Sequence, residues 1–164
     1  VGQLPLFYNH LNTGRPDPDS HIFNRYASNY LDESNEPLYP FGYGLSYTDF
    51  VYGELQISSE TLPKNGELTV SVTVTNKGNY DGYETVQLYL HDIYAEIARP
   101  VKELKGFERV FLKSGESRDV KFVITEDDLK FYNSELHYVY EPGEFDVMVG
   151  PNSRDVQTKS FQAK

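Results

Sequence analysis

The chain has 164 residues, a formal net charge of −10 and no cysteine. This length suits one domain with a tail left over. The acidic balance argues against nucleic acid and against an anionic membrane as partners, because both are bound through clustered lysines and arginines. Without cysteine there is no disulfide and no thiolate metal site. The chain begins at Val1 rather than at a methionine, which suggests a piece of a longer protein.

Residues 1–50 show neither the period of a helix nor that of a strand. Prolines and glycines interrupt them, yet aromatic residues are frequent: Phe7, Tyr8, Phe23, Tyr26, Tyr30, Tyr39, Phe41, Tyr43, Tyr47 and Phe50. Long irregular segments are uncommon in compact domains, and disordered segments are rarely so aromatic. We therefore expect residues 1–50 to be an irregular linker or interface segment. It would be ordered by packing against the following domain and against a part of the protein outside this chain.

Residues 51–164 carry the alternation of a β-sheet protein. Apolar residues recur at every second position in the series Leu68–Val74, Val86–Leu90, Val120–Ile124 and Phe145–Val149. Leu55 and Ile57 indicate an opening strand, and residues 156–162 indicate a closing one. Residues 101–112 predict a longer strand that bends near Gly106, where the alternation slips by one position.

Turn-forming residues separate these strands, among them PKNG at 63–66, NKG at 76–78, DG at 81–82, SG at 114–115 and PG at 142–143. One helical turn is expected at 126–129, with Thr125 as its N-cap and Asp128 three residues on. About seven strands without a long helical pattern are typical of an immunoglobulin-like or fibronectin type III-like sandwich. We therefore predict an all-β chain, with this sandwich at 51–164 and the irregular segment at 1–50.

The sequence contains no constellation that points to catalysis. A glycosidase needs two carboxylates facing each other, whereas the doublets at 32–33 and 127–128 are adjacent residues, which in a strand point to opposite faces. The histidines lack the spacing of metal ligands; they are His10, His21, His91 and His137. The stretch GLSYT at 44–48 lacks the second glycine of a nucleophile elbow. We predict no catalytic residue, no metal ligand and no cofactor-binding residue.

Aromatic residues near the end of the irregular segment are the candidates for binding. They are Tyr39, Phe41, Tyr43, Tyr47 and Phe50. Such rings can pack at an interface between domains, stack on the faces of sugars, or join the core of the sandwich. Packing at a domain interface is our leading interpretation, and contact with sugar is the main alternative.

The stretch PLYPFGYGLSYT at 37–48 resembles a hallmark of glycoside hydrolase family 3 β-glucosidases that lies just before their C-terminal fibronectin type III-like domain. Upstream, VGQLPLFYN at 1–9 and NTGRP at 12–16 resemble the bacterial periplasmic branch of that family. Downstream, VTNKG at 74–78, VQLYL at 86–90, KGF at 105–107 and EPGEFDVMVG at 141–150 are similar to strands of the same domain. The resemblance covers essentially the whole chain.

This resemblance implies an accessory or structural domain without a catalytic role of its own. The family carries its catalytic Asp and Glu in other domains, upstream of this region, so no catalytic residue is carried over. The implied partners are the catalytic domains of the same chain, in a retaining, periplasmic or secreted β-glucosidase that releases terminal β-D-glucosyl residues. A carbohydrate-binding module and a protein-interaction sandwich remain as alternatives.

Overall fold

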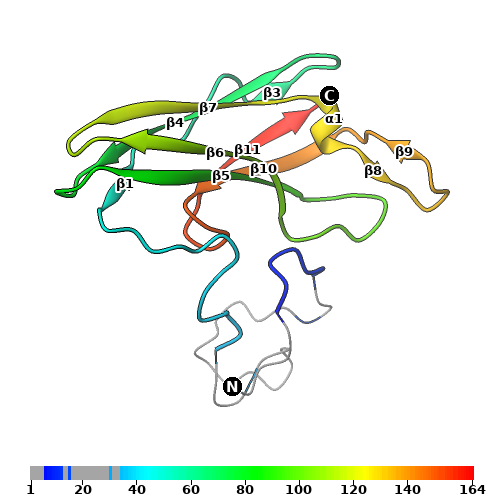
Figure 1. Ribbon diagram of the computed structural model, residues 1–164. Helices are drawn as coiled ribbons and strands as arrows, with labels where there is room; N and C mark the ends of the chain where they lie inside the picture. Colours follow the sequence, from blue (N-terminus) through cyan, green and yellow to red (C-terminus); the bar gives the residue numbers. More distant parts are fainter. Residues whose placement is uncertain (1–5, 13–14, 16–29, 31–33) are drawn as a thin grey trace.

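The computed structural model describes residues 6–12, 15, 30 and 34–164. Within them the chain forms two packed β-sheets, a small hairpin and one short helix (Figure 1). The predicted all-β sandwich is therefore confirmed. In this part of the chain no helix has the length and apolar character needed to cross a membrane.

The first sheet is built around β4 (Leu68–Asn76). Along one edge it pairs with β7 (Ser117–Ile124), and along the other with the short strands β1 (Phe50–Tyr52) and β2 (Gln56–Ile57). All three pairings are antiparallel. The backbone N–H of Gly53 donates to the carbonyl oxygen of Thr73 at 2.8 Å. This bond keeps the edge of β4 occupied between β1 and β2.

The second sheet has the order β3-β11-β10-β5-β6. These strands are β3 (Thr61–Leu62), β11 (Gln157–Ala163), β10 (Gly143–Gly150), β5 (Gly82–Asp92) and β6 (Glu103–Leu112). Only the β3–β11 pair within it is parallel. The register of β5 and β6 shifts between Leu88 and Tyr89, where Gly106 lies opposite. The bend predicted at Gly106 is thus confirmed as a β-bulge.

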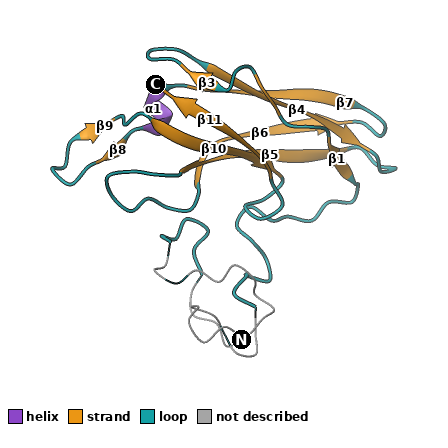
Figure 2. Cartoon of the chain, turned by 180° about the vertical axis from the view of Figure 1, so that it is seen from behind, coloured by secondary structure: helices purple, strands orange, loops and turns teal. Residues whose placement is uncertain are grey.

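Small elements lie at the end of the sandwich near the C-terminus (Figure 2). The predicted helix is α1 (Glu126–Leu129), and the carboxylate of Asp128 accepts hydrogen bonds from the backbone N–H and the hydroxyl of Thr125 at 2.8 and 3.0 Å. The hairpin of β8 (Phe131–Tyr132) and β9 (Tyr138–Val139) follows. Strands of two residues are too short to show an alternation, so no local pattern in the sequence predicts this hairpin.

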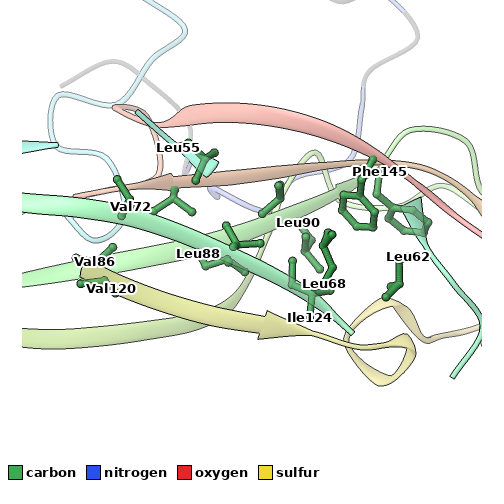
Figure 3. Packing of buried hydrophobic residues seen from close by; sticks show 14 of the residues in the cluster. Leu55, Leu62, Leu68, Val72, Val86, Leu88, Leu90, Val120, Ile124 and Phe145 are labelled. Atoms are coloured by element: carbon green, nitrogen blue, oxygen red, sulfur yellow. The ribbon is translucent and has the colours of Figure 1, made fainter. Parts of the chain in front are cut away.

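The core lies between the two sheets. Side chains of β4, β5, β7 and β10 point toward one another there (Figure 3). Every alternating apolar residue predicted for β4, β5 and β10 is buried, and Ile57 and Phe122 pack against the cluster from partly buried positions. Each fully buried side chain contributes about 1.5–3 kcal/mol relative to an exposed one.

Candidate domain interface

The outer face of β5 is covered in one stretch. Val86, Leu88 and Leu90 point into the core, so Gln87 and Tyr89 point outward, yet these two are only 5% and 0% exposed. Outward positions of an antiparallel sheet are commonly solvated. The cover comes from the segment before β1 and from the loop after β10. The described parts of that segment lie on the side of the five-stranded sheet (Figure 1).

Aromatic packing holds the segment on this face. The ring of Phe41 stacks on Tyr8 with centroids 4.1 Å apart, and the rings of Tyr8 and Tyr89 form an edge-to-face pair with centroids 5.9 Å apart. The backbone N–H of Ser153, in the loop after β10, donates to the carbonyl oxygen of Phe41 at 2.9 Å. Burial raises the pKa of Tyr89 to about 12, and its hydroxyl donates to Oε1 of Gln87. Residues distant in sequence therefore form one layer.

Gln87 links the segment to the sheet through its side-chain amide. Its Nε2 donates to the carbonyl oxygens of Gly42, at 3.1 Å, and Pro151, at 2.6 Å. Gly42 has a φ of +79°, and a Cβ built on it would lie 2.0 Å from Oε1 of Gln87. Both the positive φ and the close approach require glycine at this position. One glycine of the PLYPFGYGLSYT motif thus serves attachment to the sandwich.

Asn76 fixes the other end of the segment. Its Oδ1 accepts from the hydroxyl of Thr48 at 2.6 Å and from the N–H of Gly78 at 3.1 Å, and its Nδ2 donates to the carbonyl oxygens of Tyr80 and Leu112. Asn76 is fully buried. A Cβ on Gly78 would lie 2.2 Å from Oγ1 of Thr48. The chain at Thr48 is therefore tied to the turn between β4 and β5.

Before and between these two attachments, large apolar side chains of the segment are wholly or partly exposed. The predicted interface residues Tyr39, Phe41, Tyr43 and Tyr47 are 67%, 47%, 41% and 97% exposed. Leu38 and Leu45, which were not among the predicted interface residues, are 79% and 90% exposed. Phe50 differs: it begins β1, is partly buried, and packs against the core of the sandwich.

A cavity of about 580 Å³ opens beside the docked segment. Its lining includes Tyr8, Tyr39, Phe41, Asn35, Glu36 and Lys102. The Nζ of Lys102 donates to the carbonyl oxygen of Ser153 at 2.6 Å. Burial lowers the pKa of Lys102, and the charge of Glu36 opposes that shift. The N–H of Val101 donates to the carbonyl oxygen of His10 at 2.9 Å. This bond attaches residues 10–11 to the loop between β5 and β6.

Arg99 organises the loop between β5 and β6. Its guanidinium pairs with Asp92 at 3.1 Å and with Glu103 at 2.9 Å, and lies over the ring of Phe131, 4.6 Å from the centroid. Burial raises the pKa of Asp92, against the opposing charge of Arg99. Burial also acts to raise the pKa of Glu103, but the charges of Lys105 and Arg99 outweigh it, so that this pKa is lowered. Each ionisable group here is engaged with another, as in a structural cluster.

The carboxylates of the 127–128 doublet make local contacts instead of facing each other. Asp127 pairs with Lys130, and Asp128 caps α1. The 32–33 doublet and His21 lie outside the described residues. Within the described residues no group of three or more His, Asp or Glu side chains is arranged to hold a metal ion.

The two packed β-sheets and their strand order are those of a fibronectin type III-like β-sandwich. The family model of the fibronectin type III-like domain matches residues 84–153. The chain is 50% identical to the periplasmic beta-glucosidase of Salmonella typhimurium, over 99% of this chain and 21% of the relative. It is 42% identical to a beta-xylosidase of Formosa agariphila, over 100% of this chain and 22% of the relative.

A solved structure shows the same relation in three dimensions. The beta-glucosidase from Listeria innocua in complex with gluconolactone superposes with a TM-score of 0.89 at 47% identity, over 99% of this chain and 22% of that one. The chain thus belongs to the C-terminal fibronectin type III-like domains of glycoside hydrolase family 3 enzymes. It spans about a fifth of the length of the relatives that it matches.

Proposed function

We propose that this chain is a non-catalytic domain that braces the catalytic domains of a β-glucosidase through the segment before β1. The observation that carries the proposal is the exposure of Tyr39, Tyr43, Leu45 and Tyr47 on a backbone that is anchored at Gly42 and at Thr48. Large exposed apolar groups gathered on one surface mark interaction sites. Here the backbone is held by hydrogen bonds while the side chains stay available to a partner.

The whole protein would hydrolyse terminal, non-reducing β-D-glucosyl residues, and it would act in the periplasm or outside the cell. The names of the relatives support both points, since they include a periplasmic beta-glucosidase. The 164-residue chain itself would release no sugar from aryl β-glucosides. We also propose that the whole enzyme needs no cofactor for this hydrolysis.

The test uses the complete glycosidase polypeptide with one substitution in each of two exposed places. Tyr47→Ser removes a 97% exposed ring from the segment, and Tyr132→Ser removes a 62% exposed ring from the β8–β9 hairpin. We expect Tyr47→Ser to shorten the half-life of glucosidase activity at elevated temperature several-fold, and Tyr132→Ser to leave it unchanged. Equal half-lives for both variants and the unmodified enzyme would contradict the bracing role.

A carbohydrate-binding role is the second candidate, and the 580 Å³ cavity is the observation in its favour. Its aromatic and amide lining is of the kind that contacts sugars through ring faces and hydroxyl groups. Calorimetric titration of the chain with soluble β-glucans and cello-oligosaccharides tests this role. Heat that saturates, and that Tyr39→Ala abolishes, would support it, whereas flat titrations would exclude it.

A further inference from the structure

Past Gln87, the outer face of the five-stranded sheet presents exposed aromatic side chains. On β6 the successive outward positions are Phe107, Arg109 and Phe111, and on β5 Tyr83 lies opposite Phe111. The rings of Tyr83 and Phe111 are 5.0 Å apart. Phe107 is 67% exposed, Tyr83 53% and Phe111 38%. These four residues are called the β5–β6 aromatic face below.

The opposite sheet shows what an uncovered face of this sandwich looks like. The outward residues of β4 are Thr69, Ser71, Thr73 and Thr75, and those of β7 are Ser117, Asp119, Lys121 and Val123. The hydroxyl of Thr73 donates a hydrogen bond to the carboxylate of Asp119 at 2.6 Å, so these two outward side chains are paired with each other at the surface. Polar outward positions are the usual pattern of a solvated sheet. The aromatic composition of the β5–β6 aromatic face departs from that pattern.

Arg109 gives this face a second property. Its guanidinium lies 4.0 Å from the centroid of the Tyr83 ring, and it forms no ion pair with another described residue of a chain whose net charge is −10. A planar guanidinium that is stacked on a ring still presents its edge to a carboxylate. Arginine and aromatic residues are the types enriched at the centres of protein interfaces.

The β5–β6 aromatic face borders the anchored segment at the Gly42 attachment. Gln87, which holds Gly42, lies opposite Phe107, and both side chains are on the outer face of the sheet. Thr48, at the other attachment, approaches Gly82 from the inner side of β5, so this contact does not reach the outward ring of Tyr83. The exposed side chains of residues 43–47 begin directly after Gly42. A body that packs on those side chains and continues across Gln87 therefore meets Phe107 first.

We propose that the interface with the remainder of the glycosidase chain extends over the β5–β6 aromatic face, with Arg109 paired to a carboxylate of that remainder. The inference rests on the proposed function and names a second contact for the same partner. A partner of sufficient size exists in the relatives, since this region makes up only 21% of the periplasmic beta-glucosidase. An acidic, partly apolar surface is the chemistry that this face fits.

Hydroxyl-radical footprinting of the complete glycosidase tests the two contacts separately. The oxidation of each side chain is measured in the native enzyme relative to the urea-unfolded chain, with Tyr138 of the β8–β9 hairpin, 55% exposed, as an internal reference. We expect Phe107 and Tyr47 both to be oxidised several-fold less than Tyr138. If Tyr47 is protected and Phe107 is not, the second contact is overturned and the bracing role stands. If neither is protected, both are overturned.

A charge reversal sharpens the test of Arg109. Arg109→Glu and Arg118→Glu change the net charge equally, but Arg118 lies on β7, in the other sheet. In the complete enzyme we expect Arg109→Glu to raise the oxidation of Phe107 several-fold and to shorten the half-life of activity on heating, and Arg118→Glu to change neither. The same response from both variants would overturn the assigned ion pair.

Discussion

The sandwich and the segment that precedes it use apolar residues in opposite ways. Leu68 of β4 is fully buried, whereas Leu45 of the segment is 90% exposed. In the sandwich, backbone groups pair within the sheets and side chains fill the core. In the segment, hydrogen bonds at Gly42 and Thr48 and the packing of Tyr8 against Tyr89 make the attachments, and several large side chains remain exposed. Order in the segment therefore depends on a few contacts with the sandwich rather than on a core of its own.

The attachments themselves show why few contacts are enough. Gln87 and Asn76 are buried amides whose donors and acceptors are used, and a buried amide left unsatisfied costs roughly 1–3 kcal/mol. Each amide thus favours the single position of the segment that satisfies it.

The largest effect is expected from leucine substitutions in the two regions. Leu68→Ala should lower the free energy of unfolding of the chain by about 2–5 kcal/mol, because it leaves a cavity in the core. Leu45→Ala should change it by less than about 0.5 kcal/mol, because its side chain is already in water. Urea unfolding of the two variants measures both values. A large loss for Leu45→Ala would show that the segment buries it.

Removal of the Asn76 amide should have the next largest effect. Asn76→Ala leaves the hydroxyl of Thr48 and the carbonyl oxygen of Leu112 without these partners, and we expect a loss of about 2–3 kcal/mol in the free energy of unfolding. Asn79→Ala, at an exposed position of the same turn, is the matched control. Equal midpoints in urea for the two variants would contradict the role of Asn76.

A smaller, local effect is expected for Tyr8. Tyr8→Ala removes the ring between Phe41 and Tyr89, and aromatic pairs contribute about 0.5–1.5 kcal/mol beyond the area that they bury. The amide of Ser153, which donates to Phe41, should then exchange its hydrogen up to about tenfold faster. Exchange at this amide is measured by NMR. Tyr132→Ala, in the β8–β9 hairpin, should leave it unchanged.

The smallest effect concerns the charge of Glu84, which accepts a hydrogen bond from Tyr52 at 2.7 Å. Burial raises the pKa of Glu84 above its ordinary value of 4.5. A raised pKa in the folded state stabilises the protein below pH 4.5, and this contribution is lost as the pH rises through the folded pKa. Glu84→Gln should therefore have the higher Tm at pH 7, and the difference should vanish below pH 4.5. A difference that grows on acidification would contradict this assignment.

The long strands, the bulge at Gly106 and the helical turn after Thr125 were all predictable from the sequence. Each depends on a pattern that is local: alternation over a few residues, a slip in that alternation, or a capping residue. The candidate interface was predictable only in part. The motif at 37–48 indicates where the aromatic residues gather, but not which of them remain exposed.

Burial of a given side chain depends on what reaches it from elsewhere in the chain. Phe50 and Tyr47 are three residues apart and both aromatic, yet one packs against the core and the other is 97% exposed, because β1 begins at Phe50. Gln87 and Tyr89 occupy outward positions whose local pattern predicts solvent exposure, and Tyr8 and Phe41 cover them from far away in sequence.

The class of fold, the core residues of the long alternating strands and the family resemblance follow from the sequence alone, because hydrophobic alternation and short motifs are written along neighbouring positions. Which amides anchor the segment and which rings stay exposed depend on the tertiary structure. Those outcomes require residues separated by tens of positions to meet, and nothing in the local pattern of Gln87, Asn76 or Tyr8 shows the partner that the fold brings to it.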